Sequence, residues 1–203
     1  MIIVIDYGMG NLRSVSKALE HLGGSVKVSA EPEDIRTASK LLLPGVGAFG
    51  DGMTEINKRG LAGPIRDYAQ SDRPFLGICL GLQLLFDASE ESPGSAGLGI
   101  LKGKVRAFRS PKVKIPHMGW NSVVLKQKHP LLSGIAENSF FYFVHTYYAV
   151  PDDAAQIAAV CHYGEEDFPA MIGRGPLFAT QFHPEKSQDA GLAILKNFVE
   201  LKS

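Results

Sequence analysis

The stretch Pro74-Phe75-Leu76-Gly77-Ile78-Cys79-Leu80-Gly81-Leu82-Gln83-Leu84-Leu85-Phe86 decides the fold of this chain. A short apolar run leads into Gly-x-Cys-x-Gly, and an apolar segment of helical character follows. The glycines on either side of Cys79 predict a sharp strand-to-helix turn, because a side chain at either place would collide with the neighbouring element. Such a turn puts the thiol at the first turn of a helix, where unpaired N–H groups and the helix dipole favour the thiolate. Cys79 is therefore a candidate nucleophile.

The composition is that of an ordinary globular protein, with 203 residues, 45% of them apolar and 21% charged. This length suits one α/β domain with a sizeable core, and we expect a single domain over residues 1–203. The formal net charge of zero gives no indication of binding to nucleic acid or to a membrane surface. Cys79 and Cys161 lie far apart in the sequence, so we expect no disulfide framework and a cytoplasmic location.

The N-terminal half alternates between apolar runs and helical patterns. Strands are predicted over residues 2–6, 25–29, 40–43 and 75–78, and helices over 12–22, 51–70 (interrupted near 60–64) and 80–88. Strands separated by helices of this length predict a parallel sheet with helices on both faces. We therefore predict an α/β fold with a doubly wound, mostly parallel, flavodoxin-like sheet.

The C-terminal half has a different pattern. A loop rich in Gly, Ser and Glu over 91–99 is followed by short β-like runs over 103–109, 122–125, 140–145, 156–161, 170–173 and 177–182. Their close spacing predicts antiparallel strands that extend the sheet. An amphipathic helix is predicted over 189–201.

A cysteine nucleophile needs a base, and His183 is the best placed of the six histidines. It follows a buried strand in the segment Gln181-Phe182-His183-Pro184-Glu185. Pro184 keeps His183 out of the helical region, and an extended His-Pro-Glu would put Glu185 on the same side as His183. Because the carboxyl ends of parallel strands share one edge of a sheet, we expect Cys79 and His183 to meet there.

The reaction of a thiolate with a carbonyl also needs donors for the oxyanion. The N–H group of Leu80 directly follows the candidate nucleophile, and Pro44-Gly45-Val46-Gly47 ends another strand. The glycines on both sides of Val46 would let its peptide group reorient at little cost. We expect Leu80 and Val46 to supply the two donors.

Each of these signals also has an ordinary structural explanation. A lone buried cysteine is usually an inert small hydrophobe, and His-Pro-Glu or Pro-Gly-Val-Gly alone is usually a turn. Cys161 beside His162 resembles part of a metal site, but no further ligands are spaced for zinc, so we expect a buried structural thiol and no metal. The combination of three motifs, each at a predicted strand end, favours a catalytic site.

These motifs resemble those of the class I (triad) glutamine amidotransferases. Gly77–Gln83 is similar to the nucleophile motif of that family, and Gln181–Glu185 to its His/Glu motif. The resemblance implies a Cys79–His183–Glu185 triad that hydrolyses glutamine. It also implies an oxyanion hole formed by the amides of Val46 and Leu80, and substrate contacts from Gly45 and Gln83, with no cofactor.

Four further blocks resemble the glutaminase subunits of imidazole glycerol phosphate synthases within that family. They are residues 6–12, 44–50, 116–121 and 141–147, and together they span nearly the whole chain in the right order. The resemblance implies a heterodimer with a (βα)8-barrel cyclase subunit, to which ammonia passes for histidine biosynthesis. The candidates for the partner interface are Asn11, His117, Met118, Trp120, Tyr142 and His145, although His117, Met118 and Trp120 also suit a core position.

Two other functions fit the same residues. One is the glutaminase subunit of a different synthase, such as that of pyridoxal phosphate, or a free-standing cysteine hydrolase. The other is a non-catalytic binding module that has kept the fold, against which the complete Cys/His/Glu set argues.

Overall fold

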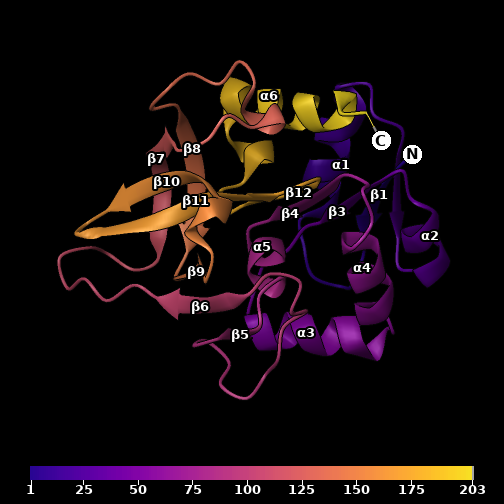
Figure 1. The fold of residues 1–203 in the computed structure, drawn as a ribbon, viewed down its shortest axis with the longest axis horizontal. Coiled ribbons are helices and arrows are strands. Elements are labelled where there is room, and N and C mark those ends of the chain that lie inside the picture. The colour runs from indigo at the N-terminus through magenta and orange to yellow at the C-terminus, as the bar shows by residue number, and fades with distance from the viewer. Residues whose placement is uncertain (203) are drawn as a thin grey trace.

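A computed structural model describes residues 1–202 and contains one nine-stranded sheet and one three-stranded sheet. Half of the large sheet is parallel, as the sequence predicts (Figure 1). Its strands, in spatial order, are β2 (Val26–Ser29), β1 (Ile2–Ile5), β3 (Lys40–Leu43), β4 (Phe75–Ile78) and β12 (Leu177–Thr180). Within this group, adjacent strands pair in parallel, so their carboxyl ends share one edge.

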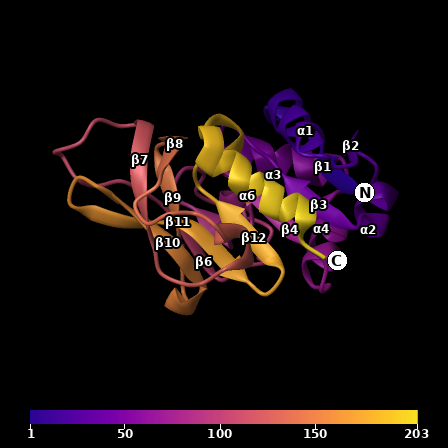
Figure 2. The same cartoon turned by 90° about the horizontal axis from the view of Figure 1, so that it is seen from above.

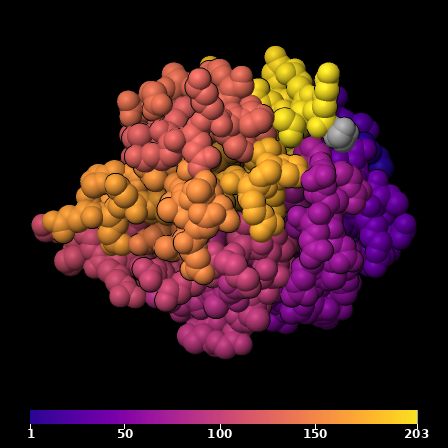
Figure 3. Space-filling model, viewed as in Figure 1, coloured from indigo at the N-terminus to yellow at the C-terminus, as the bar shows by residue number. Residues whose placement is uncertain are grey.

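Antiparallel strands continue the same sheet beyond β12. They are β11 (Glu166–Arg174), β10 (Ile157–Tyr163), β7 (His117–Leu125) and β8 (Phe140–His145). The predicted antiparallel extension is confirmed for these strands. Figure 3 shows the indigo-to-purple N-terminal segments at one end of the molecule and orange segments, which include β10 and β11, at the other.

Helices cover both faces of the parallel half (Figure 2). The buried residues of α2 (Pro32–Thr37), α3 (Phe49–Lys58), α4 (Ala62–Ala69) and α5 (Leu80–Leu84) pack with Ile3, Ile5, Leu41 and Leu43. Those of α1 (Leu12–His21) and α6 (Gln188–Glu200) pack with Ile2, Val4 and Leu42 on the other face. Successive residues of a strand point to opposite faces, so continuous apolar strands supply two cores.

The small sheet was not predicted. It consists of β5 (Ala88–Ser89), β6 (Gly103–Ala107) and β9 (Tyr147–Pro151), in that order. The prediction that residues 103–109 extend the large sheet is wrong, because β6 pairs with β9 instead. The predicted helix over 80–88 is also too long. It ends at Leu84, because Leu98 N–H donates to the Leu84 carbonyl and the chain then turns into β5.

Three short 3-10 helices complete the chain. They are η1 (Pro130–Leu132), η2 (Ala154–Gln156) and η3 (Pro184–Lys186). The last begins at Pro184, shortly after β12 ends at Thr180, and leads into α6, so it lies where the parallel strands end. Within residues 1–202, no helix combines the length and the apolar character that a membrane crossing requires.

Candidate active site

Cys79 sits in a strained turn between β4 and α5. Its φ of 54° and ψ of −109° are rare for a residue with a side chain. A Cβ atom at Gly81 would lie 1.9 Å from the Leu43 carbonyl oxygen, and one at Gly77 would lie 3.2 Å from the Ala179 Cβ. The two glycines therefore let α5 start close against the strands, and the sharp turn expected from the sequence is present.

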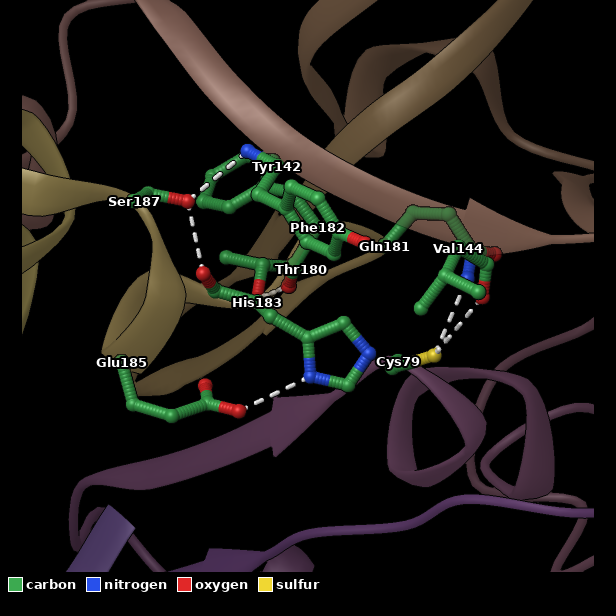
Figure 4. A network of polar contacts seen from close by, with 9 residues as sticks. All are labelled: Cys79, Tyr142, Val144, Thr180, Gln181, Phe182, His183, Glu185 and Ser187. Carbon is green, nitrogen blue, oxygen red and sulfur yellow. Dashed lines mark hydrogen bonds and ion pairs between the residues drawn. The ribbon is translucent and has the colours of Figure 1, made fainter. Parts of the chain in front are cut away.

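His183 reaches the nucleophile from the neighbouring strand. It follows β12, which pairs in parallel with β4, so the two strands end side by side. Figure 4 shows the imidazole ring between Glu185 and Cys79, with Nε2 on the side of the sulfur. Nε2 is buried and has no hydrogen-bond partner among the described residues. The structure thus brings Cys79 and His183 together.

Glu185 holds the other edge of the imidazole ring. Its Oε1 lies 2.9 Å from His183 Nδ1, and Nδ1–H donates. The expected extended conformation of His-Pro-Glu is wrong beyond His183, because residues 184–186 form η3. Lys186 N–H donates to the His183 carbonyl at 3.0 Å, and this turn, instead of an extended strand, brings Glu185 back to the ring.

A second set of hydrogen bonds fixes the backbone that carries His183. Ser187 Oγ donates to the His183 carbonyl at 2.6 Å, and Tyr142 N–H donates to Ser187 Oγ at 2.9 Å. His183 N–H in turn donates to the Tyr142 carbonyl at 3.0 Å. β8 is thereby joined to η3 beside the imidazole ring (Figure 4).

The surroundings of His183 change its pKa strongly. Burial alone lowers the pKa of the imidazole, but Cys79 and Glu185 favour the imidazolium and outweigh it, and together they raise the pKa of His183 to about 10. A base whose protonated form is stabilised by its neighbours suits proton transfer from a thiol.

A cavity of about 410 Å³ opens over the sulfur. Its wall contains Cys79, Leu80, Gln83 and His183, together with Val46 and Gly47 from the loop after β3. The rest of the lining is Glu91, Pro116, Val144, His145, Thr146 and Tyr147. The cavity is large enough for an amino acid.

Two of the remaining predicted residues also face this region. Val46 is 40% exposed at the cavity, and Leu80 is the first residue of α5, where helical N–H groups lack intrahelical partners. Gly45 does not line the large cavity. A Cβ atom there would lie 2.4 Å from Tyr7 Oη and 2.8 Å from Leu80 Cβ, so Gly45 permits close packing behind the site.

The predicted interface residues divide into surface and interior groups. Met118 is 62% exposed and Trp120 is 45% exposed, and Trp120 lies opposite Tyr142 in the β7–β8 pair. His117 and His145 are buried, with 2.9 Å between His117 Nδ1 and His145 Nε2. Their side chains are occupied inside the protein, which corrects their prediction as partner contacts.

Asn11 precedes α1 and lies behind the triad. It lines a small cavity of about 10 Å³ together with Gly45, Val46, His183 and Glu185. Asn11 is only partly exposed, so its side chain lies at the edge of the site.

Two residues close to the site were not predicted. Gln181 is fully buried beside Cys79, and Glu91 lines the cavity while its Oε2 accepts from Phe49 N–H at 2.7 Å. The position of Gln181 within the His/Glu motif was a usable signal, since a buried glutamine needs hydrogen-bond partners. Nothing local distinguishes Glu91 from the rest of its Ser- and Gly-rich loop.

Cys161 lies away from these residues and is fully buried. Burial raises the pKa of its thiol to about 12, so it is unreactive near neutral pH. His162 is paired instead with Asp167, at 2.7 Å. Among residues 1–202, no three His, Cys, Asp or Glu side chains are grouped so that they could hold a metal ion.

Comparisons with known proteins agree with this arrangement. The family model for glutamine amidotransferase class-I matches residues 3–201. The imidazole glycerol phosphate synthase subunit HisH of Methanosarcina acetivorans is 50% identical over 202 residues, which is 98% of each chain. The protein of the same name from Synechococcus elongatus is 52% identical over 200 residues, or 98% of this chain and 92% of that protein.

Solved structures share the fold at low sequence identity. A crystal structure of glutamine amidotransferase superposes with a TM-score of 0.76 at 18% identity and covers 99% of this chain and 100% of its own. The PurLQS structure from Thermotoga maritima gives a TM-score of 0.77 at 20% identity, with 97% and 96% coverage. With the family match over almost the whole chain and relatives of about half identity, this chain belongs to the class I glutamine amidotransferase family.

Proposed function

We propose that this chain is the glutaminase subunit of an imidazole glycerol phosphate synthase and hydrolyses glutamine with a Cys79–His183–Glu185 triad. The observation that carries the proposal is the Glu185–His183–Cys79 array, in a chain that is half identical to HisH subunits over nearly its full length. The proposal treats residues 1–203 as one domain located in the cytoplasm, where the two unpaired cysteines would stay reduced.

The reaction begins with proton transfer from Cys79 to His183. The thiolate attacks the side-chain carbonyl carbon of glutamine, and the N–H groups of Leu80 and Val46 stabilise the oxyanion of the tetrahedral intermediate. His183 then gives its proton to the leaving ammonia, which leaves a glutamyl thioester. Water, deprotonated by His183, attacks the thioester and releases glutamate and the free thiol.

Glu185 orients the imidazole and stabilises its charged form during both steps. Its Oε1 accepts from Nδ1–H, so the lone pair of the neutral ring lies on Nε2, toward the sulfur. This is the tautomer that can accept the thiol proton.

Gln83 supplies an acceptor for the substrate. Its Nε2 already donates to the Tyr147 carbonyl at 2.8 Å and to Gln181 Oε1 at 3.0 Å. Both hydrogens of the amide are used, so only Oε1 remains for N–H groups of glutamine in the cavity. Gly45 contributes through the backbone, since it keeps the Val46 loop close against Leu80.

The exposed face of the β7–β8 pair is the proposed surface for a (βα)8-barrel cyclase. Met118 and Trp120 present large exposed apolar side chains there, and Tyr142 lies beside Trp120, with ring centroids 6.1 Å apart. Exposed aromatic residues of this kind anchor interfaces. β8 continues from this face to Val144 and His145 at the cavity, so ammonia could leave next to the bound partner.

The partner is also proposed to activate the glutaminase through the Val46 peptide group. Gly47 has a φ of +100°, a conformation that favours glycine, and Val46 is well exposed. The peptide can therefore rotate between a position that offers its N–H to the oxyanion and one that does not. The isolated chain is then nearly idle until the cyclase and its ligand bind.

A glutaminase assay tests the proposal. Glutamate formation is measured for the chain alone, with the candidate cyclase, and with the cyclase and its nucleotide substrate. We expect slow hydrolysis alone and a large increase in the last mixture. Absence of glutamine hydrolysis in every mixture would contradict the glutaminase assignment, whereas full activity of the chain alone would contradict only the activation by the partner.

A further inference from the structure

A single main-chain carbonyl fixes the direction of the hydrogen bonds around Cys79. The Tyr147 carbonyl accepts from Gln83 Nε2 at 2.8 Å and is 2.9 Å from His145 Nδ1. A carbonyl oxygen carries no hydrogen, so both neighbours must donate to it. The orientation of the Gln83 amide and the tautomer of His145 follow from this contact.

The first branch of this network ends at the sulfur. The second hydrogen of Gln83 Nε2 is donated to Gln181 Oε1 at 3.0 Å. A carboxamide has one oxygen, so the NH2 group of Gln181 must lie on the opposite side, where Nε2 is 3.8 Å from Cys79 Sγ. Figure 4 shows the Gln181 amide turned toward the Cys79 sulfur. Gln181 is fully buried and Gln83 is 5% exposed, so water does not compete for these groups.

The second branch holds the same carbonyl from the other side. His145 donates from Nδ1, so its Nε2 accepts from His117 Nδ1 at 2.9 Å. His117 Nε2 then accepts from Asn121 Nδ2 at 3.3 Å. Burial lowers the pKa of His117 to about 4 and that of His145 to about 3, so both rings are neutral near pH 7, as these directions require.

Two uncharged groups next to the Cys79 sulfur have opposite effects on its thiolate. The Val144 carbonyl lies 3.9 Å from Cys79 Sγ and can accept from a thiol but repels a thiolate. Gln181 presents N–H to the sulfur and favours the thiolate, as does the His183 imidazolium. Of the groups in contact with the sulfur, Gln181 offers a donor that stays charge-neutral at all pH values.

We propose that Gln181 is a further catalytic residue, whose Nε2–H donates to the Cys79 thiolate, and that Gln83 is the positioning residue that turns the Gln181 amide toward the sulfur. The inference rests on the proposed role of Cys79 as the nucleophile. It deepens that role by assigning part of the thiolate stabilisation to a neutral amide.

The test is the pH dependence of thiol alkylation in Gln181→Met. Iodoacetamide is used as the probe on the full chain in a Cys161→Ala background, so that Cys79 is the only thiol. A hydrogen bond to a charged group favours the thiolate by roughly tenfold or more. We therefore expect about tenfold slower alkylation near pH 7, with the half-maximal rate moved to higher pH by about one unit.

A matched control is Gln127→Met. Its side chain also donates to main-chain carbonyls, those of Ala155 and Ile157, but it does not line the cavity over Cys79. Its alkylation profile is expected to equal that of the parent protein. If Gln181 served only to stabilise the fold, Gln181→Met would lower the melting temperature but leave unchanged the pH at which alkylation is half-maximal.

An unchanged alkylation profile in folded Gln181→Met overturns the inference. If Gln181→Met does not fold, the same alkylation profile is measured for Gln83→Met, because this substitution removes the group that orients the Gln181 amide. A slower, pH-shifted reaction of Gln83→Met supports the inference and an unchanged reaction overturns it. Alkylation requires no glutamine turnover, so these outcomes are distinct from a failure of the glutaminase assay.

Discussion

Glu185 Oε1 lies 2.9 Å from His183 Nδ1, and the two side chains are only 3% and 2% exposed. Such burial makes the contact strong, because the interior screens charge weakly. It also leaves Glu185 Oε2 buried with no hydrogen-bond partner among the described residues. The carboxylate is therefore held for its effect on the histidine, at a cost to stability.

Replacing the charge of Glu185 tests that effect. Glu185→Gln keeps the size of the side chain but removes the charge that stabilises the imidazolium. We expect kcat for glutamine hydrolysis to fall on the order of 10²- to 10⁴-fold, with a much smaller change in KM. Glu33→Gln, on an exposed side chain of α2, is the control and should leave kcat unchanged. Equal kcat values for Glu185→Gln and the parent would contradict the orienting role.

The tight turn at Cys79 predicts a large effect of Gly81→Ala on stability. The new Cβ would lie 1.9 Å from the Leu43 carbonyl oxygen, so α5 or β3 must move. We expect the free energy of unfolding in urea to fall by about 3 kcal/mol or more. Gly63→Ala, in α4 with nothing within 4 Å of the new Cβ, should leave stability unchanged or raise it by up to about 1 kcal/mol. Equal stability of the two variants would show that the turn tolerates a side chain.

The buried histidines predict a loss of stability in mild acid. Burial lowers the pKa of His117 and of His129 to about 4, and that of His145 to about 3, below the value of about 6.5 in an unfolded chain. Between about pH 6.5 and 4 the unfolded state therefore binds more protons, so stability falls as pH falls, by up to about 1.4 kcal/mol per pH unit for each histidine.

His183 changes the stability with pH in the opposite direction. Its folded pKa, about 10, lies above the unfolded value, so its contribution is complete below about pH 6.5 and is lost as pH rises toward 10. Urea unfolding from pH 4 to 10 should therefore show a maximum near pH 6.5. His129→Gln cannot titrate, so below pH 6.5 its unfolding free energy should depend less steeply on pH, by the equivalent of about one bound proton. If the unfolding free energy of the parent protein rose steadily toward pH 4, the buried histidines could not be neutral.

Trp120→Ala tests the proposed surface for the cyclase. Truncation of an aromatic anchor typically costs about 2 kcal/mol or more, so we expect the Kd for the cyclase to rise roughly thirtyfold in titration calorimetry. The stability of the isolated chain should change little, because Trp120 is 45% exposed. Val28→Ala, 42% exposed on β2 at the other edge of the large sheet, is the control. Equal Kd values for both variants would show that Trp120 is not part of the interface with the cyclase.

The sequence predicted the parallel half of the fold closely because its signals are local. Lys40–Leu43 and Phe75–Ile78 are strands with the expected bounds, since each is a short, mostly apolar run ended by Pro44 or by the nucleophile turn. Cys79, His183 and Glu185 meet because parallel strands end at one edge. This relationship follows from topology and needs no knowledge of side-chain packing.

The features that were missed depend on contacts between distant segments. β9 follows β8 after only Thr146 and pairs with β6, and no local pattern marks the change of sheet. His117 and His145 look like polar positions on a surface, yet each satisfies the other inside the protein. The proposed role of Gln181 likewise depends on its contacts with Gln83 and Cys79, which are distant in the sequence.

The most direct measurement of the central claim is the site of covalent labelling by a glutamine analogue that carries a diazoketone. The labelled chain is digested and the modified peptide is identified by mass spectrometry, with and without excess glutamine. The account predicts one adduct, on Cys79, that glutamine suppresses and that Cys79→Ala and His183→Ala lose or form far more slowly. Labelling at Cys161, or glutamine hydrolysis at the parent rate by Cys79→Ala, would contradict it.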